Sequence, residues 1–149
     1  MSLRPLSQLD FRGEFRVGRM SESQHLSTYV ERSAAEVYAY AVNPANLPNW
    51  AAGLSGAIEQ RDGRWFAESP MGEVEVTIVP ENPYFVLDHE VKLADGTTFN
   101  NPMRVIADGT GSEVVFTLRR RPDQSDDDYE ADATAIRTDL TTLKQLLER

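Results

Sequence analysis

The sequence predicts an α+β fold in which a curved antiparallel sheet of about seven strands closes around one long C-terminal helix. Six short segments between residues 54 and 121 alternate apolar and polar side chains, and turn-forming residues separate them. One amphipathic helical pattern follows over 126–148. Two short helices are predicted between the first two strands, so the order of elements is specific even before any motif is considered.

The first 23 residues are set apart from a single domain over 24–149. Alternation of apolar and charged residues within them is typical of a strand with one apolar face, and its apolar positions are Leu9, Phe11, Phe15 and Val17. Such a strand would add to the domain's own sheet, or to the sheet of a second copy, which would make a homodimer. The alternative is a leader without regular structure.

The domain opens with a strand over 24–31 and a helix that begins at Ser33. Glu36 follows Ser33 by three positions, which is the spacing of a capping box. Asn43 precedes Pro44 and ends this helix, because a residue before proline avoids the helical region. A second helical turn over 44–50 is expected to bury Trp50.

The remaining strands are predicted near 54–60, 63–69, 73–79, 84–94, 97–107 and 112–121. Their connections are short, so neighbouring strands should pair antiparallel. The final helix, over 126–148, begins after Ser125 and has one apolar stripe, formed by Tyr129, Ala133, Ile136, Leu140, Leu143 and Leu147.

Composition excludes several classes of function. The net charge is −9 and the pI is about 4.7, which argues against a nucleic-acid partner. The absence of cysteine excludes disulfides and thiolate chemistry, and two histidines are too few for a multi-histidine metal site. No apolar run reaches the ~20 residues of a membrane span, and no secretion signal is visible. We therefore expect a cytoplasmic protein without metal or cofactor.

The turn at residues 94–96, Ala-Asp-Gly, predicts the register of the two strands beside it. A three-residue hairpin turn with a left-handed glycine places His89 opposite Asn101. One face of the sheet is then apolar apart from this pair, and it comprises Phe85, Leu87, His89, Val91, Leu93, Phe99, Asn101, Met103 and Val105. The strands on either side add Val74, Val76, Ile78, Val114, Phe116 and Leu118.

The strand over 63–69 has two candidate registers. A three-residue turn at 70–72 would point Arg64, Phe66 and Glu68 toward the core. A four-residue loop would point Trp65 and Ala67 there instead, and it is favoured because it leaves the two charges in water.

Residues 29–38, Tyr-Val-Glu-Arg-Ser-Ala-Ala-Glu-Val-Tyr, are followed by Asn43-Pro44 and by Leu-Pro-Asn-Trp at 47–50. This pattern resembles the opening of the polyketide cyclase/dehydrase group of the START-like superfamily, also called SRPBCC, and the resemblance covers residues 24–148. It implies a helix-grip fold with a deep cavity between sheet and helix. Members include lipid carriers, plant hormone receptors, aromatic cyclases and co-chaperones, so the resemblance implies a fold more than a function.

The expected function is binding of a small hydrophobic or aromatic molecule, or a lipid, in that cavity. The candidate ligand-binding residues are His89, Asn101, Leu87, Val91, Phe99, Met103, Phe116, Leu118, Tyr38, Trp50, Trp65, Tyr129 and Ile136. For each aromatic residue, filling the core is the competing interpretation. An alternative is a cyclase or dehydratase with His89 as catalytic acid or base, and a second alternative is a co-chaperone-like interaction module. The sequence leaves open the ligand, the oligomeric state and whether a reaction is catalysed.

Overall fold

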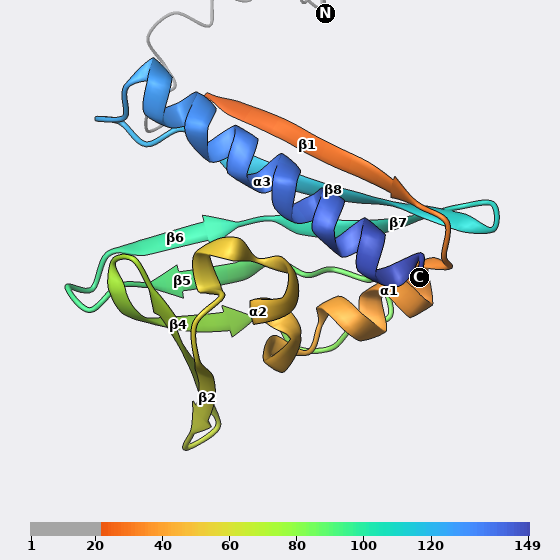
Figure 1. Cartoon of the computed structure of the whole chain (residues 1–149), viewed down its shortest axis with the longest axis horizontal. Helices are drawn as coiled ribbons and strands as arrows, with labels where there is room; N and C mark the ends of the chain where they lie inside the picture. The colour runs from red at the N-terminus through yellow and green to blue at the C-terminus, as the bar shows by residue number, and fades with distance from the viewer. Residues whose placement is uncertain (1–21) are drawn as a thin grey trace, which may run out of the picture.

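A computed structural model describes residues 22–149, and the strand predicted over 9–17 lies outside the described residues. Figure 1 shows the arrangement of the elements. In chain order they are β1 (Ser23–Val30), α1 (Ala34–Ala41), the 3-10 turn η2 (Pro44–Asn46), α2 (Leu47–Trp50), the 3-10 turn η3 (Ala52–Leu54), β2 (Ile58–Arg61), β3 (Arg64–Ser69), β4 (Gly72–Ile78), β5 (His89–Lys92), β6 (Thr98–Asn101), β7 (Met103–Asp108), β8 (Gly111–Arg119) and α3 (Asp126–Leu147).

The strands form two antiparallel sheets, one of order β1-β8-β7 and one of order β2-β3-β4-β5-β6. The sheets join where β6 runs into β7, and the long helix α3 lies across the resulting curved surface (Figure 1). Helices α1 and α2 lie on the same side as α3, and α2 contacts α3 directly. The predicted helix-grip architecture is confirmed. No helix in the described part of the chain is long and apolar enough to span a bilayer.

The strand predicted over 97–107 is divided at Pro102, which raises the number of strands in the described residues to eight. Proline has no N–H to donate to a neighbouring strand. After it, the Met103 N–H donates to the Asp88 carboxylate at 2.9 Å, and Leu87 N donates to Met103 O at 2.8 Å. The predicted register therefore continues through the break.

Two other predicted strands are shorter in the structure. The strand expected near 54–60 starts only at Ile58, because the chain first forms the 3-10 turn η3. The strand expected near 84–94 is regular only from His89 to Lys92. Before it, the Asn82 side chain accepts from Tyr84 N and Val86 N at 3.1 Å each, and these bonds hold a turn in place of a ladder.

The predicted helix starts are confirmed by their hydrogen bonds. Ser33 Oγ accepts from Glu36 N at 3.2 Å, and Ser125 Oγ accepts from Asp128 N at 3.1 Å. Asn43 Oδ1 accepts from Ala45 N at 3.1 Å, at the start of the turn that buries Trp50. Such caps satisfy N–H groups that have no partner inside a helix.

The inner face of the sheet packs against the apolar stripe of α3. Four members of that stripe are buried and two are half-buried; the buried ones are Tyr129, Ala133, Leu140 and Leu143. On β3, Ala67 pairs with Val74 and is only 1% exposed. The favoured register of the 63–69 strand is thereby confirmed, and it leaves Arg64 and Glu68 exposed.

Candidate functional site

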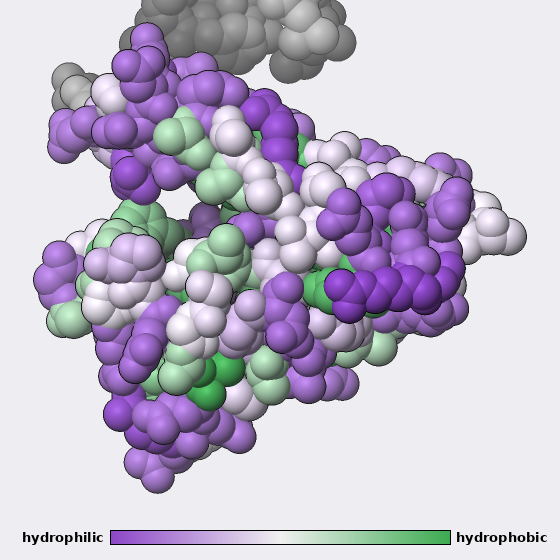
Figure 2. Space-filling model, viewed as in Figure 1, coloured by the Kyte–Doolittle hydropathy of each residue, from purple (hydrophilic) through white to green (hydrophobic). Residues whose placement is uncertain are grey.

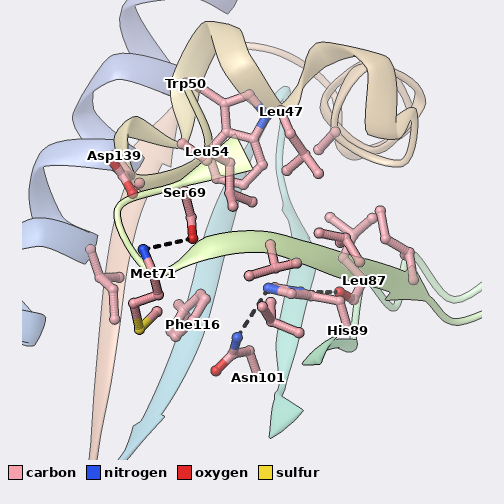
Figure 3. A pocket seen from close by; sticks show the side chains of 18 of the residues that line it. Leu47, Trp50, Leu54, Ser69, Met71, Leu87, His89, Asn101, Phe116 and Asp139 are labelled. Atoms are coloured by element: carbon pink, nitrogen blue, oxygen red, sulfur yellow. Dashed lines mark hydrogen bonds between the residues drawn. The ribbon is translucent and has the colours of Figure 1, made fainter. Parts of the chain in front are cut away.

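A cavity of about 370 Å³ lies between the sheet, α3 and the segment from α2 to η3. Figure 3 shows side chains from all three converging on it. The sheet supplies Val74, Val76 and Ile78 from β4, His89 and Val91 from β5, Asn101 from β6 and Phe116 from β8, with Leu87 just before β5. The opposite wall includes Leu47, Trp50, Leu54, Ile136 and Asp139. The walls are almost wholly apolar, so the few polar side chains define the chemistry of the site.

The cavity opens beside the tip of the β3–β4 hairpin. Met71 at this tip is 63% exposed and lines the opening. Figure 2 shows the surface hollowed between the N-terminal half of α3 and the sheet, with apolar side chains at the rim. An adjoining hollow continues outward from the cavity past Phe99, Leu118 and Arg121. A ligand therefore has a route from solvent to the interior along a hollow lined by both apolar and charged side chains.

His89 is held in one neutral tautomer by its hydrogen bonds. Its Nδ1 lies 3.0 Å from Leu87 O, and a carbonyl oxygen only accepts, so Nδ1 carries the hydrogen. Burial lowers the pKa of His89 and favours the neutral ring, although Leu87 O and the Asp88 carboxylate oppose this shift. Nε2 therefore presents a lone pair.

Asn101 faces that lone pair from the next strand. Its Nδ2 lies 3.4 Å from His89 Nε2, and Figure 3 shows the two side chains pointing toward one another at the cavity floor. The Phe116 ring stands edge-on to the imidazole, with centroids 5.9 Å apart. His89 and Asn101 therefore form a polar pair within an apolar wall.

Asp139 contributes a carboxyl group to the opposite wall from α3. Its Oδ1 accepts from Ala52 N at 3.1 Å, which ties α3 to the η3 turn. Burial raises the pKa of Asp139, and the backbone hydrogen bond only partly offsets this effect. Ser69 also lines the cavity, but its hydroxyl already donates to Gly72 O and accepts from Met71 N.

The cavity brings together seven of the predicted ligand-binding residues, namely Trp50, Leu87, His89, Val91, Asn101, Phe116 and Ile136. Phe99 and Leu118 line the adjoining outer hollow. The Trp50 ring faces the cavity, while its Nε1 is buried without a hydrogen-bond partner in the described part of the chain.

The other four predicted residues lie away from the cavity. Met103 is buried on β7, which α1 covers. The Tyr38 hydroxyl accepts from Asn82 N at 3.0 Å, and Tyr129 lies beneath the Arg120 guanidinium, so both belong to the core. Trp65 lines a separate surface hollow beside Val42 and Pro44. Met103, Tyr38 and Tyr129 do not line the cavity because other core side chains pack against them.

Several residues that line the cavity were missed by the sequence reasoning, among them Leu47, Leu54, Ser69, Asp139 and Met71. Asp139 follows Ile136 by three positions and precedes Leu140, so the helical period places it beside the apolar stripe. A charge at that position is the signal that would have identified it. Met71 lies in a turn, where no periodic pattern applies. Among residues 22–149, no three His, Asp or Glu side chains are grouped to hold a metal ion.

No protein-family model and no curated protein matches this sequence. Several solved structures have a similar fold. An uncharacterized protein from Bacillus thuringiensis matches 85% of this chain and 98% of its own, at 14% identity and a TM-score of 0.69. DynU16, from the dynemicin biosynthetic locus, matches over 85% of this chain and 47% of its own, at 11% identity and a TM-score of 0.65.

A third solved structure is Ara h 8.0201. It matches 86% of this chain and 98% of its own, at 10% identity and a TM-score of 0.59. At these identities the likeness shows a shared fold. The helix-grip fold that the predicted resemblance implied is thereby confirmed.

Proposed function

We propose that this helix-grip domain binds a small hydrophobic or aromatic molecule in the cavity between the sheet and α3. The observation that carries the proposal is the cavity itself, about 370 Å³ and lined almost entirely by apolar side chains. Ligand pockets in proteins are typically ~300–1,000 Å³, mostly apolar, with a few placed polar groups. The volume favours a compact ligand of one or two rings over a long lipid.

The driving force is removal of apolar surface from water. Apolar burial contributes roughly 25 cal/mol per Å², and the Trp50 and Phe116 rings offer flat surfaces to an aromatic ligand. DynU16, which shares the fold, comes from a biosynthetic locus, a setting that supports a small-molecule ligand. The exposed Met71 side chain is unbranched, and it suits a rim that must adapt as a ligand enters.

Acid or base catalysis by His89 is the competing function, because Nε2 presents a lone pair to the cavity. A catalytic histidine commonly has a carboxylate that orients it and stabilises its charged form. His89 Nδ1 instead donates to a backbone carbonyl, and burial lowers its pKa. Burial makes the ring a weaker base, although the Leu87 carbonyl partly opposes this effect, so binding is favoured over proton transfer.

The test is to purify the full chain, extract it with organic solvent and identify bound small molecules by mass spectrometry. Ile136→Trp places a bulky ring in the cavity wall and should abolish the bound molecule. Ile106→Trp is the matched control, because Ile106 is 50% exposed on the other side of the sheet. An extract with no small molecule from the unmodified chain, or equal occupancy in both variants, would contradict the proposal.

A further inference from the structure

We infer that the ligand is uncharged and carries a hydroxyl group that donates to His89 Nε2 and accepts from the Asn101 side-chain amide. This inference rests on the proposed function and specifies the chemical class of the ligand. It is carried by the hydrogen-bonding geometry of the polar pair and by the charges around the cavity.

One ring nitrogen of His89, Nε2, is available to accept a hydrogen bond from a ligand. Leu87 O takes the Nδ1 hydrogen at 3.0 Å, so Nε2 of the neutral ring only accepts. Nε2 faces a cavity whose neighbouring walls are Val91, Phe116 and Leu87. A buried acceptor without a good donor costs free energy, and a ligand that brings a donor removes that cost.

The second step is the length of the bond from Asn101. Its Nδ2 lies 3.4 Å from Nε2, whereas a good N–H···N or N–H···O bond is ~2.9–3.0 Å. Because this bond is long, both the Asn101 amide and His89 Nε2 can form a shorter hydrogen bond with a ligand. A hydroxyl fits both needs, because it donates one hydrogen and accepts at its oxygen. A ketone or an ether only accepts, so it satisfies the amide and leaves Nε2 without a donor.

The third step concerns charge. Among residues 22–149, no lysine or arginine lines the cavity, whereas Asp139 adds a carboxyl group. An anion buried without a counter-charge is strongly disfavoured. At the outer hollow, Arg120 is paired with Glu22 and Asp126, and Arg121 with Asp132. Arg119 also lines this hollow, but it is exposed and lies outside the cavity. Inside the cavity, a carboxylate ligand such as a fatty acid would therefore meet the Asp139 carboxyl group and the His89 Nε2 acceptor without a cation to balance its charge.

Four probes of matched size separate these properties: naphthalene, 2-naphthol, 2-methoxynaphthalene and 2-naphthoate. Their affinities for the full chain are measured by titration at pH 7.5. We expect 2-naphthol to bind roughly three- to tenfold more tightly than 2-methoxynaphthalene, the value of about one hydrogen bond. We expect 2-naphthoate to bind most weakly. These comparisons use the unmodified chain and need no variant.

Two histidine variants test whether His89 is responsible for the preference for a hydroxyl group. His89→Phe should reduce 2-naphthol to the affinity of 2-methoxynaphthalene and change the latter by less than about twofold. His25→Phe should keep the preference, because His25 is exposed on β1 and bonded to Thr117, away from the cavity.

The outcomes separate the two proposals. If none of the probes binds, the cavity does not take a small aromatic molecule, and the proposed function fails together with this inference. If all four bind with equal affinity, the proposed function stands and the hydroxyl assignment is overturned. Tightest binding of 2-naphthoate, or a preference that survives His89→Phe, also overturns it.

Discussion

The Asn101 side-chain amide lies 3.4 Å from His89 Nε2, and the two residues are directly paired across β5 and β6. Their alignment is set at the far end of the hairpin, where Leu93 N donates to Thr97 O at 2.8 Å. Gly96 in this turn has a φ of +90°, as the three-residue turn requires. A local turn thus determines which two polar side chains meet in the cavity.

Gly96→Ala should lower the free energy of unfolding by about 1–2 kcal/mol, because a β-carbon disfavours a positive φ. No atom lies within 4 Å of the added β-carbon, so the cost is conformational. Gly53→Ala is the matched control, with equally open space and no positive φ, and it should be neutral or slightly stabilising. Equal effects in urea denaturation would contradict the turn geometry.

Stability should fall with decreasing pH because His89, half-buried in the cavity wall, is held in its neutral form. Its pKa is lowered from 6.5 by burial, so the unfolded chain binds a proton more readily than the folded chain. The stabilisation from His89 is therefore complete above pH 6.5 and is lost as the pH falls through the lowered pKa. Urea denaturation at pH 8 and pH 5 should show a smaller decrease for His89→Phe. Parallel decreases would mean that His89 does not titrate differently on folding.

Leu140→Ala should destabilise the domain by roughly 2–5 kcal/mol, the usual cost of removing a buried leucine side chain. Leu140 is 2% exposed on the face of α3 that packs on the sheet. Gln145→Ala on the exposed face of the same helix is the control and should change little. Similar small losses for both in chemical denaturation would refute the packing of α3.

Glu148→Ala would be a poor control for Leu140→Ala, although Glu148 lies at the C-terminal end of the same helix, α3. It lies off the apolar stripe, but its carboxylate accepts from Glu31 N at 2.8 Å and from Lys144 Nζ at 2.9 Å. These bonds lower the pKa of Glu148 and tie the end of α3 to the end of β1. We therefore expect Glu148→Ala to be measurably destabilising.

Deleting residues 1–19 should lower the melting temperature or change the mass in solution. The alternation of Leu9, Phe11, Phe15 and Val17 predicts a strand, and within residues 22–149 β1 pairs only with β8. An added strand would cover the open edge of β1, within one chain or between two. Thermal melting and light scattering of the two forms test this, and unchanged values would make the segment a leader.

Much of the fold was predictable because it depends on neighbours in sequence. The caps at Ser33 and Ser125 rest on hydrogen bonds that span three residues. The β5–β6 register follows from one turn and an alternation of period two. The break at Pro102 was missed, although proline there signals it directly, since a proline lacks the N–H that a ladder needs.

The membership of the cavity was decided by contacts between segments distant in the sequence. His89 and Met103 share one inner face, but Met103 is buried on β7, which contacts α1, whereas His89 lines the cavity. Trp65 was expected at the cavity and lines a different hollow.

The sequence by itself determined the order of elements, the inward face of each central strand and the pairing of His89 with Asn101. Only the tertiary structure decided which inward side chains are packed in the core and which line the cavity. It also added Asp139 and Met71 to the site. The physical reason is that local backbone geometry determines whether a side chain on a strand points toward the core or toward solvent. The gap between α3 and the sheet depends instead on the summed volumes of side chains from α1, α2 and several strands.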